Sequence, residues 1–335
     1  MDHFLFRLQF ETAVHFGTSD GALSLATSEE HVRADTLFSA LCQTALCLYG
    51  PEGVEELCEQ VQRGELLLSD TMPWRGDTLF LPKPVTAAEK EQELPTDQRK
   101  KRKKQRWIPV SDWEGYAAGF RGGSGYVGEE VSTSFGRHME LTKARTPQGE
   151  DAQPYQVGLF QFGVKVDCGQ VKVDCGLYFL CACQPERIDR LAKLVSTLGL
   201  SGLGGKTSAG FGKFQIAGKA DGPIALEKGE DCQQQTLNRC LAAQKGPYLL
   251  LTSSLPGAEE LEDALEGADF RLIRRSGFVQ SETYRPTAAK KRSQYFLSAG
   301  AVFQNPFQGD LYQVGDAGSH PVYRYGRPLF MGVPE

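Results

Sequence analysis

The stretch Gly199-Leu-Ser-Gly-Leu-Gly-Gly-Lys-Thr-Ser-Ala-Gly-Phe-Gly-Lys-Phe214 is the most informative part of the chain. It contains six glycines and two lysines but no acidic residue. Glycines permit positive φ angles and let backbone N–H groups approach a phosphate closely. Lys206, Thr207 and Ser208 add a positive charge and two hydroxyl groups. The stretch therefore fits a loop that holds an RNA backbone, although its glycines alone would also suit a tight turn between a helix and a strand.

The flanks of this loop argue against a nucleotide-hydrolysing site. Apolar residues at helical spacing predict a helix over about 185–198, and a strand is expected over 211–216. The tripeptide Gly205-Lys206-Thr207 resembles the end of a Walker A motif, but that motif needs a glycine where Leu200 stands. It also requires the order strand, loop, helix, whereas here the helix precedes the loop.

The hydrophobic periodicity of the rest of the chain predicts the elements on either side of this loop. Residues 3–10 alternate as a strand, and a helix follows at about 35–49 with Asp35 as its expected N-cap. Further short strands and the helix at 185–198 complete a βαββαβ order, which is typical of a ferredoxin-like unit with a large insertion. We place this first domain at residues 1–218 and a second at 222–335.

The insertion, at about 83–150, is expected to form an arm that carries Arg137, His138 and Arg145. It includes a run at 99–106 in which seven of eight residues are basic, a composition typical of a solvated loop. Just after it, the heptapeptide that starts at Val164 is repeated almost unchanged from Val171. Both copies alternate like strands, and we expect the duplication to lengthen a hairpin tip.

The composition narrows the class of protein. The chain has 335 residues, 40% hydrophobic residues and a formal net charge of −5, which excludes a generally basic nucleic-acid binder. Positive charge is nevertheless concentrated at 271–292, with seven basic residues against the single acid Glu282. No apolar run reaches the ~20 residues of a membrane span, and no export signal is read, so a cytoplasmic protein is expected. The nine cysteines are scattered, and we expect neither a metal nor another cofactor.

The loop at 202–213 resembles the glycine-rich loop of the RAMP superfamily of CRISPR proteins. Together with segments 13–17, 33–41 and 274–326, it makes nearly the whole chain, with residues 83–150 least clear, similar to the fourth Csm subunit of type III-A effector complexes. The resemblance implies an α+β fold with two ferredoxin-like (RRM-like) domains. It also implies a non-catalytic subunit that binds the 5′ handle of CRISPR RNA, docks the large signalling subunit and ends the filament of repeated backbone subunits.

The predicted RNA-binding residues lie on the loop, the arm, the first helix and the basic C-terminal segment. They are Arg33, Arg137, Arg145, Lys206, Thr207, Ser208, Arg274, Arg275, Tyr284, Arg285, Lys290, Lys291 and Arg292. Two alternatives stay open at this point. One is a metal-independent endoribonuclease that processes CRISPR RNA with His15 or His31, and the other is a scaffold whose RNA contacts all come from neighbouring subunits.

Overall fold

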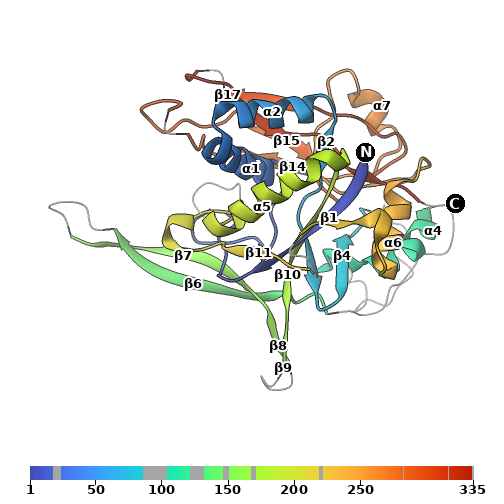
Figure 1. The fold of residues 1–335 in the computed structure, drawn as a ribbon, viewed down its shortest axis with the longest axis horizontal. Coiled ribbons are helices and arrows are strands. Elements are labelled where there is room, and N and C mark those ends of the chain that lie inside the picture. Colours follow the sequence, from blue (N-terminus) through green and yellow to red (C-terminus); the bar gives the residue numbers. More distant parts are fainter. Residues whose placement is uncertain are drawn as a thin grey trace.

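One antiparallel sheet organises the first two-thirds of the chain, with strands β1 (Asp2–Phe10) and β10 (Cys175–Cys183) at its centre (Figure 1). Its strands follow the order β11-β1-β10-β3-β4-β5, and β2 also pairs with β10 while β12 pairs with β1. Every residue of β10 is buried, as expected for an uninterrupted apolar strand. The other strands are β2 (Leu66–Leu68), β3 (Met72–Arg75), β4 (Thr78–Pro82), β5 (Trp107–Pro109), β11 (Phe214–Ile216) and β12 (Ile224–Ala225).

The computed structural model describes residues 1–17, 24–85, 104–120, 132–145, 151–166, 171–218, 222–281, 283–315 and 317–333. Most of the basic run at 99–106 therefore lies outside the described residues. Within the described ranges, no helix is both long and apolar enough to cross a membrane.

Three helices form a layer beside the sheet (Figure 1). They are α1 (Ala34–Tyr49), α2 (Pro51–Gln62) and α5 (Ile188–Ser201). Helix α5 buries Leu191, Leu194, Val195 and Leu198, which are the apolar positions that predicted it. Two further helices, α4 (Trp113–Phe120) and α6 (Cys232–Leu241), lie together elsewhere on the molecule (Figure 1). The predicted strand at 3–10 and the helices near 35–49 and 185–198 are thus confirmed.

Two hairpins project from this body (Figure 1). The longer one, which we call the arm, pairs β6 (Gly136–Arg145) with β7 (Gln153–Phe162) over ten residues each. The arm extends past the predicted end near residue 150, because the alternation at 155–162 belongs to its return strand. The shorter hairpin pairs β8 (Val164–Val166) with β9 (Val171–Val173), so the two copies of the sequence repeat pair with each other.

The C-terminal region forms three small antiparallel sheets and packs on the same core. Tyr325 lies in that core, and its hydroxyl accepts a hydrogen bond of 2.8 Å from the Leu68 amide. The two predicted domains are therefore in intimate contact. The sheets are β16 (Val302–Phe303), β13 (Tyr248–Leu250) and β19 (Phe330–Met331); β14 (Leu272–Arg275) and β15 (Gln294–Leu297); and β17 (Leu311–Gly315) and β18 (Val322–Tyr325), with the short helix α7 (Leu261–Leu265) beside them.

Candidate RNA-binding surface

The glycine-rich loop joins α5 to β11 and lies on the segment that follows β1. The Gly205 amide donates to the His15 carbonyl at 2.8 Å, and the Gly212 amide donates to the Ala13 carbonyl at 2.9 Å. At Gly212 the φ angle is +79°, and a Cβ atom would lie 2.2 Å from the Leu203 carbonyl oxygen. Only glycine fits there, because any side chain would collide with the backbone.

This packing corrects one part of the sequence interpretation. The loop was expected to grip a phosphate chain through its amides, but those of Gly205, Ala209, Gly210 and Gly212 all donate to backbone carbonyls. Glycine serves here mainly for close packing. What the loop offers to a ligand is the side chains at its turn, where Lys206 adopts a left-handed conformation with φ 62° and Ser208 is exposed.

The arm presents cations along one face. Since side chains alternate across a strand, Arg137, Lys143 and Arg145 share a face of β6 with the apolar residues Met139 and Leu141. Met139 is 36% exposed and Leu141 37% exposed. A face that alternates cations with partly exposed apolar side chains suits contact with RNA or with a protein better than contact with water alone.

The loop and the outer half of the arm form one surface, because Lys143 and Tyr155 are the eighth of the ten residue pairs counted from the root of the hairpin. The Lys206 ammonium lies 5.3 Å from the centre of the Tyr155 ring on β7, and the Lys143 ammonium lies 5.2 Å from the ring of Phe211. Tyr155 is also the cross-strand partner of Lys143. We call this the loop–arm surface and define it by Lys206, Thr207 and Ser208 of the loop and Arg137, Lys143 and Arg145 of the arm. Sequence reasoning missed Lys143, although it stands six positions after Arg137 and two before Arg145, and these even spacings place all three side chains on one face of a strand.

The two histidines that are candidates for acid–base catalysis, His15 and His31, both pack against other parts of the chain. His15 is only 6% exposed, and its Nδ1 lies 2.7 Å from the Gly158 carbonyl oxygen, so the ring fastens the arm beneath the loop. Burial, together with the charges of Arg33 and Arg106, lowers the pKa of His31 to about 3. Its ring packs edge-on against Trp107. The neutral imidazole of His31 therefore has no proton to give as a general acid at physiological pH, although it could still accept one as a general base.

The basic C-terminal segment is divided between the surface and the interior. Arg274, Arg285, Lys290 and Arg292 are exposed. Lys291 is half-buried, and desolvation lowers its pKa despite the nearby charge of Asp35. The basic C-terminal segment therefore keeps four exposed cations, and Lys291 loses its proton at a lower pH than an exposed lysine does.

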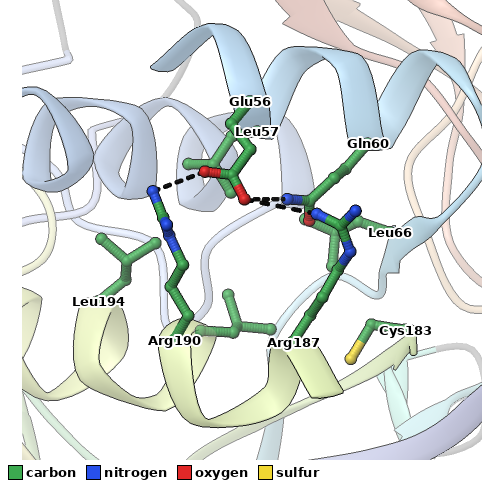
Figure 2. A pocket seen from close by; sticks show the side chains of 9 residues that line it. Glu56, Leu57, Gln60, Leu66, Cys183, Arg187, Arg190 and Leu194 are labelled. Carbon is green, nitrogen blue, oxygen red and sulfur yellow. Dashed lines mark hydrogen bonds and ion pairs between the residues drawn. The ribbon is translucent and has the colours of Figure 1, made fainter. Parts of the chain in front are cut away.

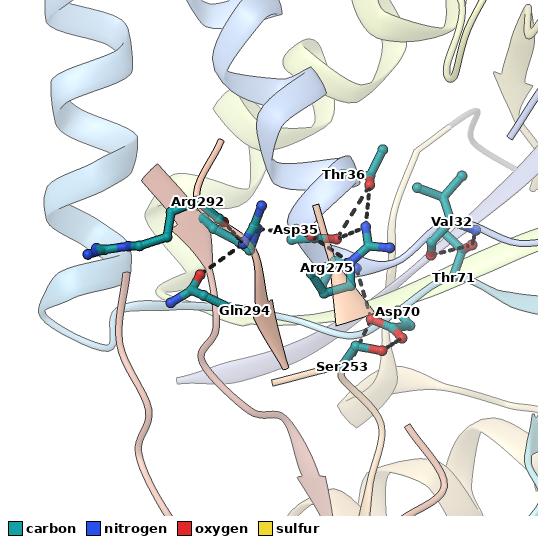
Figure 3. Close-up of polar contacts among 11 residues, drawn as sticks. Val32, Asp35, Thr36, Asp70, Thr71, Ser253, Arg275, Arg292 and Gln294 are labelled. Atoms are coloured by element: carbon teal, nitrogen blue, oxygen red, sulfur yellow. Dashed lines mark hydrogen bonds and ion pairs between the residues drawn. The ribbon is translucent and has the colours of Figure 1, made fainter. Parts of the chain in front are cut away.

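Two of the predicted contact residues, Arg275 and Tyr284, are buried, which leaves their side chains little surface for RNA. Arg275 is 8% exposed and donates to Asp35 through Nη2 at 2.7 Å and Nε at 2.9 Å (Figure 3). Asp35 was expected to cap α1, but the amide at the start of that helix donates instead to Asp70 at 2.8 Å. Tyr284 is 4% exposed and packs against the strands β17 and β18, so its ring has no free face for a base.

Arg33 lies at the junction between the two regions of the chain. It occupies the N-cap position of α1 and is half-buried. Desolvation and the neighbouring Arg275 lower its pKa. Its proposed contact with RNA stays a prediction.

Two hollows elsewhere on the molecule are weaker candidates for a binding site. Between α2 and α5, Glu56 bonds to Arg190 at 2.6 Å and to Arg187 at 3.4 Å around a space of about 20 Å³, enough for roughly one water molecule (Figure 2). A wider groove of about 440 Å³ lies beside the arm, where Glu29 pairs with Arg106 and Glu30 with His138. Its carboxylates and cations largely neutralise each other, so the loop–arm surface remains the stronger candidate.

Comparison with known proteins places the chain in a family. Residues 243–333 match the model of the CRISPR Csm4 C-terminal domain. A Mycobacterium tuberculosis strain H37Rv protein described as CRISPR system Cms protein Csm4 is 35% identical over 338 residues, which cover 100% of this chain and 99% of that protein. The chain belongs to the Csm4 family. A Csm4 protein of Streptococcus thermophilus is 27% identical over 342 residues, covering 98% of each chain.

Solved structures of Csm4 share the fold. In a Csm3–Csm4 subcomplex of the type III-A CRISPR–Cas interference complex, the matching chain has a TM-score of 0.61 at 16% identity, with 100% of both chains covered. In a Csm1–Csm4 cassette in complex with cA4, the TM-score is 0.57 at 19% identity, with 99% of both chains covered. The mixed α/β architecture with antiparallel sheets is therefore that of Csm4, and the family resemblance seen in the sequence is confirmed.

Proposed function

We propose that this chain is the subunit of a type III-A CRISPR effector complex that binds the 5′ handle of the CRISPR RNA and joins the large signalling subunit to the filament of backbone subunits. It does so without catalysing a reaction of its own. The loop–arm surface carries this proposal, because Lys206 and Lys143 meet there beside aromatic rings, with Arg145 farther along the same face. Cations and aromatic side chains together are what single-stranded RNA requires.

The partners are inferred from relatives. Csm4 chains of the same fold occur with Csm1 in one solved structure and with Csm3 in another. The present chain covers the full length of those chains, so it has room for both kinds of contact. The arm and the C-terminal sheets are separate surfaces, which is what a subunit between two partners needs.

The fold supports the same assignment. In the first sheet, β11, β1, β10 and β3 are adjacent in that order and antiparallel, with α1 and α5 as the two crossover helices. We infer that this unit is ferredoxin-like (RRM-like), with the arm inserted before β10. The C-terminal region is inferred to be a second, more divergent unit of the same type.

A binding experiment tests the RNA contact. The full chain with Lys206→Ala and Lys143→Ala should bind a labelled RNA copy of the repeat-derived handle more weakly. The slope of log affinity against log salt should flatten by about 1.4, since each neutralised phosphate of a single strand contributes ~0.7. The matched control is Lys193→Ala with Lys228→Ala, because both lysines are exposed and the Lys193 ammonium also lies over a ring, 5.7 Å from Tyr49. If the two double variants had the same RNA affinity and the same salt dependence, the proposal would be contradicted.

Catalysis and partner binding need separate assays. Incubation of the protein with labelled repeat RNA is expected to leave the RNA intact, and site-specific cleavage that His15→Ala abolishes would overturn the non-catalytic assignment. Co-expression with the large subunit and the backbone subunit should recover all three together. Recovery of only one partner would contradict the bridging role.

A further inference from the structure

The hairpin formed by β14 and β15 exposes an aromatic ring beside a guanidinium. Arg274 and Tyr295 are direct cross-strand partners, and both are exposed. Directly opposed side chains in an antiparallel pair lie on one face with Cβ atoms about 5 Å apart. Tyr295 is 62% exposed, which is high for a large ring in a folded chain. Leu272, on the same face of β14, is 59% exposed.

The same ribbon repeats this arrangement farther along. The backbone of 277–279 continues to pair with 289–291, because the Val279 amide donates to the Ala289 carbonyl and the Lys291 amide to the Gly277 carbonyl, both at 2.8 Å. Phe278 and Lys290 face each other across this extension. Phe278 is 50% exposed, and the Lys290 ammonium lies 5.7 Å from the centre of its ring.

The surroundings of these rings are positive. Exposed cations follow the ribbon on both strands, and the described residues from 271 to 281 and from 283 to 295 include no carboxylate side chain. The exposed cations are Arg271, Arg274, Arg285, Lys290 and Arg292. With Arg275 turned inward to Asp35, the ribbon separates a buried face that joins the two regions of the chain from a solvent face that carries charge and rings.

We propose that Tyr295 and Phe278 are base-stacking residues of a second single-stranded RNA site, on the solvent face of the β14–β15 ribbon. The ring of each residue stacks on a base, and Arg274 and Lys290 bind the adjoining phosphates. The inference rests on the proposed function, since it gives the RNA held by the loop–arm surface a further contact on the C-terminal region.

The observations favour RNA over a protein partner. Cores of protein interfaces are depleted of charged residues, and of lysine in particular. On this ribbon each ring has its own cation, and the two rings are separated along the ladder rather than joined in one apolar patch. Isolated rings flanked by cations suit bases on a phosphate chain, because every base has a face that can stack and every nucleotide brings one negative charge.

Three substitutions at matched exposure test the proposal in the full chain. The probe is a labelled single-stranded RNA without secondary structure. Tyr295→Ala should weaken its binding roughly 5- to 100-fold, the usual loss on removing a stacked ring. Tyr295→Phe should bind within about twofold of the unaltered chain, since the ring is kept. Leu272→Ala should also leave binding unchanged, because that equally exposed side chain has no stacking face.

Other outcomes separate this inference from the proposed function. Equal binding by the unaltered chain and Tyr295→Ala would overturn the second site. The proposed function would still hold if the Lys206 and Lys143 double variant weakened binding. If Tyr295→Ala and Leu272→Ala both spared RNA binding but abolished recovery with the large or the backbone subunit, the ribbon would be a protein interface and the inference would be wrong.

Discussion

Removing the buried carboxylate of Asp35 should lower the free energy of unfolding by far more than removing one exposed carboxylate would. Two guanidinium groups from the C-terminal region converge on Asp35. Arg275 lies at 2.7 Å (Figure 3) and Arg324 at 3.7 Å, and the side chains of all three residues are at most 10% exposed. In Asp35→Ala both cations stay buried without their anion. Breaking a buried pair in this way typically costs 3–5 kcal/mol, so we expect a loss of about 4 kcal/mol.

A double variant distinguishes the effect of losing the ion pair from the effect of leaving a cavity. Asp35→Leu with Arg275→Met removes one charge of each sign and keeps most of the volume, so it should be at least ~2 kcal/mol more stable than Asp35→Ala. The control is Glu56→Ala, which also removes a carboxylate from two guanidinium groups, Arg190 at 2.6 Å and Arg187 at 3.4 Å, but with side chains that are 34% to 46% exposed. Water screens these pairs, so their loss should cost no more than about 1 kcal/mol.

Urea denaturation followed by circular dichroism measures all three free energies of unfolding, with the slope of each transition checked for constancy. If Asp35→Ala lost less than about 1 kcal/mol, or if the double variant were as unstable as the single one, the buried pair would not have the role assigned to it.

The acid dependence of this pair follows from its pKa. Burial alone would raise the pKa of Asp35, but the charge and hydrogen bonds of Arg275, with Arg324 and Arg33, bring it below 3.8. Its contribution to stability is therefore complete well above pH 3.8 and disappears as the pH falls through the lower folded value. The difference in stability between the unaltered chain and Asp35→Ala should shrink on strong acidification, and a constant difference would contradict the argument.

Three further predictions follow from single residues. His31→Gln should reduce the loss of stability on acidification below pH 6.5, because the folded chain holds the pKa of His31 at about 3 and resists its protonation; an unchanged pH profile in urea would contradict this. Gly212→Ala should unfold the loop region, whereas Gly210→Ala, with φ +87° but nothing within 4 Å, should cost only ~1–2 kcal/mol; equal melting temperatures would be inconsistent with the clash. Tyr325→Phe should cost ~1–3 kcal/mol in urea by leaving the Leu68 amide unpaired, and an unaffected midpoint would argue against that bond.

Periodicity predicted the parts of the fold where local pattern and burial agree. The alternation at 3–10 and the helical spacing of Leu191, Leu194 and Leu198 both match buried faces of the structure. The tandem repeat likewise indicated a hairpin, since two identical alternating segments can pair without a register conflict. Such features need no knowledge of distant partners.

For the charged residues, the local sequence pattern does not predict which side chains are buried. Arg274 and Arg275 are neighbours on one strand, so one of them had to face inward, but the sequence does not show which. The choice is decided by Asp35, 240 positions away along the chain. In the same way, glycines at 205 and 212 indicated a loop, but only the position of the segment at 13–16 shows that their amides are already engaged.

The position of β1 at the start of the chain also affects folding during synthesis. Its partners in the sheet begin at Leu177 and end at Ala225, so the first strand to leave the ribosome waits for roughly 165 residues before it can pair. At ordinary elongation rates that interval is on the order of 10 to 30 s. The nascent chain carries an unpaired apolar edge during this time, and any release of the polypeptide before residue 183 leaves a product prone to aggregate.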